Sequence, residues 1–460
     1  MKTKLILLLV ITSLVIFTTG CKKQGAQTPT RANIVTLNYY KLFENEENLQ
    51  PLFNKFQQVN PNIRINYKKF TDPEKYLETI LSELAEGTGP DIISVPSTWV
   101  AQNYKKLSPA PSNYATPTVI DDVFVNVVKK DNVLIDTDGI QKVFGIPLSV
   151  DTLALYYNDK LFEQFLPELG KPSQTWNGLK ANAELLTLPD EQNNLIRSGL
   201  SIGTGEGIFR SSDIFKLMLL QNNISLFDKN YSRVNIANNT KTTELLNFYS
   251  SFSNSNTPVW ADNLGSENEK ELYAFVTNKT AMIFGYSYLY KDLLNTIELA
   301  KRNGEKNVIS TKDIKITSLP QFKNQETPIA LANYYTESVT RNSKNAELSW
   351  KLITFLADPD NLREYYKKEF KPTSRRELIA EQKENSIFGV FATQLGIAES
   401  FIVNDENKTN QIIKKLLDNA ALNKDPSLNS RNLLVESQNE LDNLIPNEGA
   451  YPPSKNKLKK

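Results

Sequence analysis

The pattern of hydrophobic and polar positions near the start of the chain switches between two periods. Residues 33–40 and 62–70 alternate between apolar and polar side chains, which predicts two strands. Between them, apolar residues recur every three or four positions over 49–59, which predicts a helix. A second helical pattern begins near Pro73, and the continuous apolar run at 91–96 (DIISVP) indicates a buried strand. Strands that alternate with helices predict a parallel, doubly wound α/β sheet.

The pattern changes in the middle of the chain. Residues 153–312 carry mainly helical periodicity, interrupted by the short strand pattern TAMIFG at 280–285. Strand patterns return at 314–320 and 331–340, and the last part of the chain is helical again. This return to strands after a helical insertion predicts two lobes that are joined by several crossings of the chain, with a second lobe rich in helices.

These changes set the predicted boundaries of the lobes. We place the first lobe at residues 33–150 and 313–372, and the second lobe at residues 151–312 and 373–450. Residues 451–460 (YPPSKNKLKK) are polar and basic, and we expect them to form a disordered tail.

The N-terminus has the pattern of an export signal. Two lysines precede an apolar run at 5–17, which is shorter than the roughly 20 residues of a membrane span, so residues 1–20 are predicted to be a signal peptide. The only cysteine, Cys21, follows Thr-Thr-Gly, and this stretch resembles a bacterial lipoprotein lipobox, in which the cysteine is acylated. Residues 21–32 are then a lipidated tether. Ordinary cleavage nearby and an uncleaved anchor are the alternatives.

Composition narrows the chemistry further. The formal net charge of +1 gives no excess of basic residues for nucleic acid, so we expect no nucleic-acid partner. The chain contains no histidine, which excludes a Ser-His-Asp triad, a Cys-His pair and any histidine-ligated metal site. We predict no cofactor and no metal site.

Candidate ligand-binding residues follow from the predicted strands. In an open α/β sheet, ligands bind beyond the carboxyl ends of the strands. The residues selected by this rule are aromatic or polar: Tyr40, Phe43, Thr98, Trp99, Tyr286, Tyr334 and Tyr335. Aromatic rings cover the C–H faces of sugars, while polar groups bind the hydroxyls. For each ring taken alone, packing in the core or between the lobes is the alternative.

One aspartate interrupts the apolar, strand-like run GIPLSVDTLALYYN at 145–158. A buried carboxylate is costly unless a partner stabilises it. Asp151 falls where the chain first leaves the predicted first lobe, so we expect it to accept hydrogen bonds from ligand hydroxyls. A helix cap or a hinge hydrogen bond is the alternative. Arg375, in PTSRREL, is a further candidate for the cleft, with a surface salt bridge as its alternative.

A glycine-containing stretch at 202–209 (IGTGEGIF) is partly similar to a phosphate-binding loop. It lacks the Lys-Ser/Thr pair of a P-loop, and its glycines do not have the dinucleotide-binding spacing. We interpret it as an ordinary loop.

Several of these segments resemble family 1 extracellular solute-binding proteins, the sugar receptors of ABC importers. The strongest are GTGPDI at 87–92, the run at 145–158 and TAMIFGY at 280–286, and the similarity covers most of residues 33–400. The resemblance implies a two-lobe periplasmic-binding-protein-like fold that closes around a ligand by hinge motion. It also implies that Asp151 lies at the inter-lobe crossing and binds sugar hydroxyls, and that Tyr286 stacks on the sugar ring.

We therefore expect an extracytoplasmic, lipid-anchored monomer that captures a carbohydrate, an oligosaccharide in the first instance, and delivers it to an ABC permease. It is not expected to be an enzyme. A binding protein for a peptide or a glycerophosphodiester is the main alternative, and a ligandless structural lipoprotein is another. An extracellular glycosidase would need a second carboxylate beside Asp151, and no pattern in the sequence singles one out.

Overall fold

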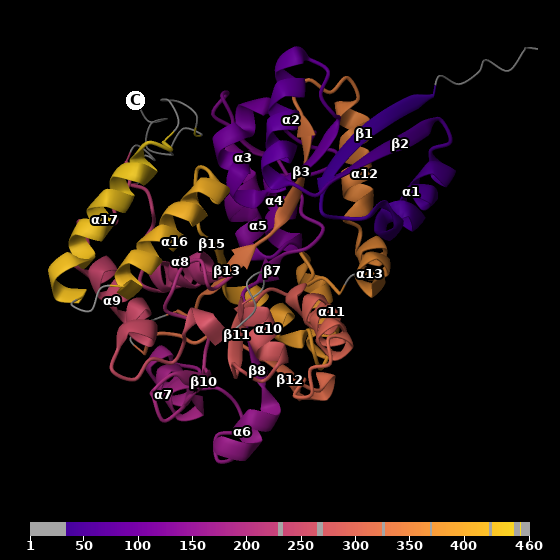
Figure 1. The fold of residues 1–460 in the computed structure, drawn as a ribbon. Helices are drawn as coiled ribbons and strands as arrows, with labels where there is room; N and C mark the ends of the chain where they lie inside the picture. The colour runs from indigo at the N-terminus through magenta and orange to yellow at the C-terminus, as the bar shows by residue number, and fades with distance from the viewer. Residues whose placement is uncertain are drawn as a thin grey trace, which may run out of the picture.

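The computed structural model describes most of the chain after the predicted tether. The described residues are 34–228, 233–264, 270–323, 327–368, 370–422, 426–445 and 451. The predicted signal peptide, the tether with Cys21, and all but the first residue of the predicted tail lie outside these ranges. Figure 1 shows two lobes, one formed mainly by the indigo N-terminal part with orange returning segments, the other by magenta, pink and yellow segments.

The first lobe is built on a five-stranded sheet with the order β2-β1-β3-β14-β4. Its strands are β1 (Val35–Leu42), β2 (Ile63–Phe70), β3 (Ile92–Pro96), β4 (Leu107–Ser108) and β14 (Tyr335–Thr340). The strand β1 pairs in parallel with β2 and β3, as the sequence pattern predicts, while β14 runs antiparallel to β3. A segment from late in the chain therefore completes the sheet.

Helices cover both faces of this sheet. The core on one face includes α1 (Glu46–Val59), α4 (Pro117–Val123), α5 (Asn126–Asn132), α12 (Ala346–Leu356) and α13 (Pro359–Lys368). The core on the other face includes α2 (Pro73–Glu86) and α3 (Ser97–Asn103). A short hairpin of β5 (Val133–Ile135) and β6 (Gln141–Val143) extends the lobe.

Local sequence explains the bounds of α2. The Asp72 carboxylate accepts the backbone N–H groups of Glu74 and Lys75 at 2.9 and 3.1 Å, which caps the first turn. Gly87 ends the helix with a φ of 75°, a left-handed conformation that glycine adopts without strain.

The second lobe is built on a three-stranded sheet with the order β11-β8-β12. The central strand β8 (Ala154–Asn158) is antiparallel to both β11 (Met282–Gly285) and β12 (Ile314–Thr317). The predicted boundary at residue 313 assigned β12 to the first lobe, and this assignment is wrong. Pairing with β8 holds β12 in the second lobe, and the chain joins the first-lobe sheet only at β14.

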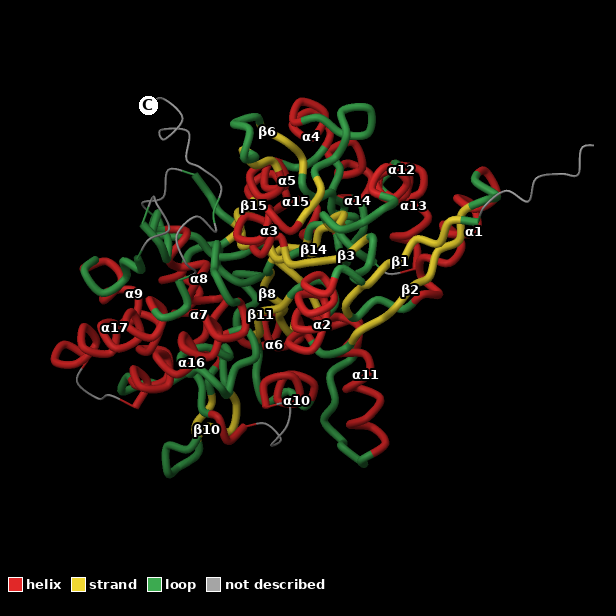
Figure 2. Tube along the Cα trace, turned by 90° about the horizontal axis from the view of Figure 1, so that it is seen from above, coloured by secondary structure: helices red, strands yellow, loops and turns green. Residues whose placement is uncertain are grey.

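Helices also pack on both faces of the second-lobe sheet. One core includes α6 (Asp159–Phe165), α7 (Trp176–Leu186), α8 (Ser211–Gln221), α9 (Thr240–Asn254), α16 (Glu406–Leu422) and α17 (Pro426–Asp442). The other core includes α10 (Lys270–Val276), α11 (Leu289–Arg302) and α15 (Gly389–Gln394). Two short strands, β9 (Leu188–Pro189) and β10 (Leu195–Arg197), also belong to this lobe, while α14 (Ile379–Lys383) contacts the first-lobe core through Ile379. Seen from above, β1 and β2 lie at one end of the molecule and α16 and α17 at the opposite end (Figure 2).

A small sheet of β15-β13-β7 joins the two lobes. Its strands are β7 (Asp151–Thr152), β13 (Ala330–Asn333) and β15 (Ala398–Ser400). Each strand lies where the chain passes from one hydrophobic core to the other. Val150 belongs to the first-lobe core and Leu153 to the second-lobe core. The chain returns between Leu331, in the second-lobe core, and Ala332, in the first-lobe core. Asp151 therefore stands between the two cores.

Candidate functional site

A small cavity lies between the two lobes, with a volume of about 80 Å³. Both lobes supply side chains to its wall. From the first lobe come Ser97, Thr98, Tyr334 and Tyr335; from the joining strand comes Asn333; and from the second lobe come Asp213, Lys216, Tyr286 and Glu406. The mix of rings, amides, hydroxyls and charges is typical of a binding site for a polar small molecule.

The strand ends explain why these residues meet. Thr98 lies in the first turn of α3, directly after the carboxyl end of β3, and Tyr286 directly follows β11. The backbone N–H of Ser97 donates to the carbonyl of Tyr334 at 3.0 Å, so the start of α3 is fixed against the chain that leaves β13. Because β8 and β11 are antiparallel, the end of β11 lies beside the start of β8, close to Asp151.

Tyr286 offers an unused polar group inside this site. Its side chain is 1% exposed, and its hydroxyl has no hydrogen-bond partner among the described residues. Burial and the nearby Asp213 carboxylate raise the pKa of this phenol well above its ordinary value, while the Arg210 cation opposes them. A buried hydroxyl without a partner is costly in a protein, and a ligand oxygen in the cavity would satisfy it.

Asp151 lies at the joining sheet, and its carboxylate bonds to the neighbouring backbone. It accepts hydrogen bonds from the Ser287 N–H at 3.0 Å, the Ser287 hydroxyl at 2.6 Å and the Thr152 N–H at 2.8 Å. Burial raises its pKa to about 7, and the bonds from Ser287 and Thr152 oppose that shift. In this conformation Asp151 ties the inter-lobe crossing to the chain that follows Tyr286, which corresponds to the hinge alternative.

Tyr334 and Tyr335 both line the cavity, but Tyr334 has its hydroxyl engaged elsewhere. That hydroxyl donates to the buried carboxylate of Asp131 at 2.7 Å, and the Ser400 hydroxyl donates to the same oxygen at 2.5 Å. Burial raises the pKa of Asp131, and these two hydrogen bonds lower it in part. Tyr334 therefore forms part of the cavity wall while its hydroxyl is fixed in the first lobe.

A charged network on the second-lobe wall was missed in the sequence. The Lys216 ammonium donates to the carboxylate of Glu406 and to the amide oxygen of Asn410, both at 2.6 Å, and lies 3.8 Å from Asp213. Asp213 also contacts the Arg210 guanidinium at 3.4 Å. The available signal was an aspartate and a lysine three residues apart within the apolar helix DIFKLMLLQ, since a buried lysine needs carboxylate partners.

Five predicted ligand residues do not line this cavity: Asp151, described above, and Tyr40, Phe43, Trp99 and Arg375. Tyr40 packs on Phe70 with ring centroids 5.5 Å apart, and Phe43 is exposed at a left-handed φ of 64°. Trp99 is buried in the core beneath α2 and α3. Arg375 donates to Glu377 at 2.6 Å and to the carbonyl oxygen of residue 357 at 2.9 Å, so the surface salt bridge is its observed role.

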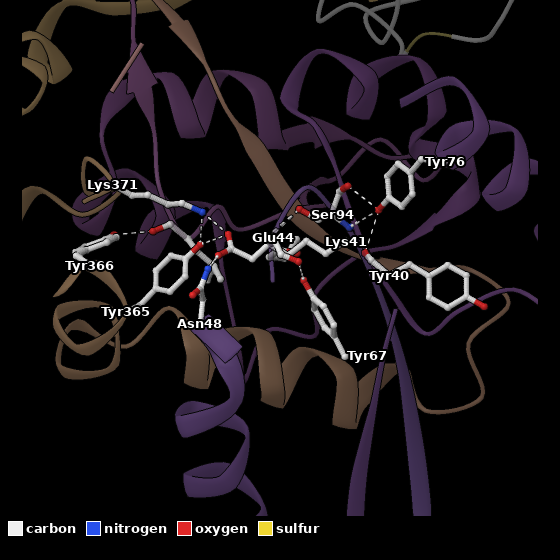
Figure 3. A network of polar contacts seen from close by, with 12 residues as sticks. Tyr40, Lys41, Glu44, Asn48, Tyr67, Tyr76, Ser94, Tyr365, Tyr366 and Lys371 are labelled. Atoms are coloured by element: carbon white, nitrogen blue, oxygen red, sulfur yellow. Dashed lines mark hydrogen bonds and ion pairs between the residues drawn. The ribbon is translucent and has the colours of Figure 1, made fainter. Parts of the chain in front are cut away.

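A buried polar network occupies the carboxyl end of β1, where Tyr40 and Phe43 were expected to meet a ligand (Figure 3). Lys41 forms an ion pair with Glu337 of β14 and donates to the Ser94 hydroxyl at 3.2 Å. The Glu44 carboxylate pairs with Lys371 and accepts the Tyr365 hydroxyl at 2.6 Å. Protein side chains therefore fill this end of the strand.

The Glu44 carboxylate is strongly stabilised in its ionised form. Burial alone would raise its pKa, but the ammonium groups of Lys371 and Lys41 outweigh burial and lower the pKa to about 2. Since Lys371 belongs to the segment that leads back from α13, this ion pair anchors the returning chain to the end of β1.

Two absences hold for the part of the chain that the structure describes. No group of three or more Cys, Asp or Glu side chains that could hold a metal ion occurs within it. Across the same ranges, no helix has both the length and the apolar character needed to span a bilayer.

Comparison with solved structures identifies the fold. The sugar-binding protein MalE from Xanthomonas citri superposes with a TM-score of 0.71 at 16% identity, over 89% of this chain and 97% of that chain. The cyclic alpha-maltosyl-1,6-maltose binding protein from Arthrobacter globiformis gives a TM-score of 0.69 at 14% identity, over 90% and 99% of the two chains. MalE from Bdellovibrio bacteriovorus, bound to maltotriose, gives 0.64 at 15% identity, over 89% and 100%. The predicted two-lobe periplasmic-binding-protein fold is confirmed.

Sequence comparison adds relatives that match over part of the chain, and a family. Proteins named as binding proteins in Brucella abortus and Brucella suis are 25% identical over 128 residues, a match that spans 28% of this chain and 29% of each relative. A family model described as bacterial extracellular solute-binding protein matches residues 52–384, well over half of the chain. With the two-lobe fold and the cavity between the lobes, this match shows that the chain belongs to the bacterial extracellular solute-binding proteins.

Proposed function

We propose that this solute-binding protein captures a carbohydrate, in the first instance an oligosaccharide, and delivers it to the permease of an ABC importer. The observation that carries the proposal is the cavity shared by both lobes, whose wall combines the tyrosines Tyr286, Tyr334 and Tyr335 with hydrogen-bonding side chains. Rings and hydrogen-bonding groups on opposite walls suit the two chemical faces of a sugar. Members of this family bind solutes and do not turn them over, so no catalytic step is involved.

Binding requires a change in the spacing of the lobes. Small-molecule sites usually enclose roughly 300–1,000 Å³, whereas this cavity encloses about 80 Å³. The joining sheet is the natural hinge, because its short strands connect the two hydrophobic cores. The lobes open to admit the ligand and close around it, and the closed form is the one that docks on the permease.

A charged solute is the second candidate, and the ionic network on α8 favours it. Lys216, Asp213 and Glu406 line the cavity and would face an ammonium, a carboxylate or a phosphate as readily as a hydroxyl. A peptide and a glycerophosphodiester both carry such groups. In a sugar complex, the same charged groups would form hydrogen bonds with the sugar hydroxyls. Such charge-assisted hydrogen bonds are stronger than those between neutral groups.

One ligand screen separates these candidates. Isothermal titration calorimetry of the purified protein is run against a panel of mono- and oligosaccharides, a mixture of short peptides and glycerophosphodiesters. Saturable heat with an oligosaccharide supports the proposal. Binding of a peptide or glycerophosphodiester alone replaces it with the second candidate.

The membrane anchor is part of the proposal and has its own test. We propose that Cys21 is acylated after removal of residues 1–20 and that the monomeric protein is held on the outer side of the cell membrane. Cys21→Ser should move the protein from the membrane fraction to the medium or periplasm. Retention of the variant in the membrane fraction would instead indicate an uncleaved anchor.

A further inference from the structure

The glycine-containing loop before α8 is held in a fixed shape by carboxylates. The N–H groups of Gly205 and Glu206 donate to the two oxygens of Asp418 at 2.6 and 3.0 Å, and the N–H of Phe209 donates to the buried Glu271 at 3.1 Å. A Cβ on Gly205 would lie 2.0 Å from a carbonyl oxygen of α16, so the loop packs directly on that helix. Its amides are engaged by the protein itself, which rules out the phosphate-loop interpretation for them.

This anchored loop ends in an aromatic side chain that points outward. Phe209 is 60% exposed, although its backbone N–H is bonded to Glu271 and α8 begins two residues later, at Ser211. The Arg210 guanidinium lies 4.2 Å from the Phe209 ring centroid, and 5.0 and 5.4 Å from those of Tyr286 and Tyr288. The Arg210 guanidinium therefore contacts all three rings.

The three rings connect the cavity to the surface. Tyr286 lines the cavity and is buried, while Tyr288, stacked on it at 5.9 Å with ring planes 20° apart, is 48% exposed. Phe209, the third ring in contact with Arg210, is exposed as well. These contacts thus link one ring of the cavity wall, Tyr286, to two exposed rings, Phe209 and Tyr288, which we call the outer patch. Such rings bind at a low entropic cost, because the loop and the guanidinium already hold them in place.

We propose that Phe209 and Tyr288, held around Arg210, form an outer carbohydrate subsite that binds the sugar units extending out of the cavity. The inference rests on the proposed function and deepens it, because these residues would then select ligands by the length of the oligosaccharide. The two exposed rings supply faces for sugar C–H groups, and Arg210 has N–H donors beyond the one that Asp213 accepts.

The size of the patch favours a glycan over a protein partner. A stable protein interface buries about 800 Å² on each partner, and two exposed side chains cannot supply that area alone. A sugar unit is covered by one or two rings, and this patch is continuous with the cavity through Tyr286. The occupant is therefore the outer part of the same ligand.

The test compares oligosaccharides of increasing length. Calorimetry is run on the wild type and on Phe209→Ala with maltose, maltotriose, maltotetraose and maltohexaose, and with the same lengths of whichever glycan series binds best in the screen. We expect Phe209→Ala to weaken binding of the longer chains by about tenfold while the shortest binding member is unchanged. Phe209→Tyr, which keeps the ring, should restore the affinity for long chains.

A matched control exists elsewhere in the same lobe. Phe165 is 41% exposed with the Arg197 guanidinium 4.4 Å from its ring, so Phe165→Ala removes a similar pair away from the cavity and should leave every affinity unchanged. Equal affinities of wild type and Phe209→Ala at all lengths would overturn the subsite but leave the proposed function intact. An equal loss at all lengths would also overturn it. If the wild type bound no glycan, both inferences would fail together.

Discussion

Two buried ionic networks, one in each lobe, differ in what surrounds them. In the first lobe, Lys41 and Glu337 are both buried and pair with each other, and neither lines the inter-lobe cavity. Lys41 also donates to Ser94 (Figure 3). In the second lobe, Lys216 is equally buried, but its partner Glu406 has a side chain 34% exposed, and both line the inter-lobe cavity. The comparison teaches that burial of charge alone does not mark a binding site. A network is open to a ligand only where it reaches a cavity.

Removing one cation from each network should give the largest difference between the lobes. Lys41→Met leaves Glu337 buried without its cation, and should lower the free energy of unfolding by about 3–5 kcal/mol. Lys216→Met should cost less, about 1–3 kcal/mol, because Glu406 retains contact with solvent and Asp213 keeps Arg210. Urea denaturation measures both. If the two variants lost the same stability, the distinction between a sealed and an open network would be wrong.

Two carboxylates, Glu44 of the first lobe and Asp151 of the joining sheet, should respond to pH in opposite directions. Glu44 has its pKa lowered to about 2, so the stability that it contributes is complete above the unfolded pKa of about 4.5 and is lost as the pH falls toward 2. Asp151 has its pKa raised to about 7, so its contribution is complete below about 4 and is lost as the pH rises through 7.

Matched amide variants isolate the pH dependence of stability that each carboxylate contributes. Relative to Glu44→Gln, the wild type should lose stability on acidification between about pH 4.5 and 2. Relative to Asp151→Asn, it should lose stability as the pH rises from about 4 to 7. Thermal unfolding across this pH range measures both differences. Parallel curves for Asp151→Asn and wild type would show that Asp151 ionises in the folded protein as it does in the unfolded chain.

A smaller effect is expected from the hydroxyl of Tyr286, a residue of the cavity wall. Tyr286→Phe keeps the ring and removes the unpartnered hydroxyl, so ligand affinity should fall by about two- to tenfold, the net value of one hydrogen bond. Stability should stay the same or rise slightly, because a buried hydroxyl without a partner is removed. Calorimetry with the best ligand tests the expected affinity, and a melting curve tests the expected stability. Unchanged affinity would place the hydroxyl outside the ligand contacts.

The smallest effects are expected at the residues that the structure places away from the cavity. Phe43→Ala and Arg375→Ala should each leave the ligand affinity within about twofold of wild type, because neither side chain lines the cavity. Arg375→Ala should lower the melting temperature slightly through loss of its bonds to Glu377 and the neighbouring carbonyl. A large loss of binding in either variant would mean that the liganded form uses a different cleft.

The hydrophobic pattern predicted the first lobe well, because its helices and strands are defined by neighbours in sequence. Both bounds of α2 could be read from Asp72 and Gly87, and the parallel pairing of β1, β2 and β3 followed from their alternation with helices. The crossing at Asp151 was visible as a carboxylate in an apolar run. The pattern failed at β12, since nothing in IKITSLP indicates which of two sheets it joins.

The candidate site was predicted only in part. Thr98, Tyr286, Tyr334 and Tyr335 meet at one cavity, as the rule of strand ends suggests. The same rule also selected Tyr40 and Phe43, because it does not show whether protein or ligand fills the end of a strand. Lys216 and Glu406 were missed because they lie 190 residues apart and come together only when α16 packs on α8.

The sequence alone determined the class of the protein, the signal-like N-terminus, the alternation of strands and helices, and the place where the chain first crosses between lobes. These properties depend on periodicity and on short motifs. The tertiary structure alone decided which strand ends face a cavity. That choice depends on long-range pairing, such as β14 beside β3, which brings Glu337 to Lys41 across 296 residues and fills one strand end. Register between distant segments is set by the packing of the whole core, which no local pattern encodes.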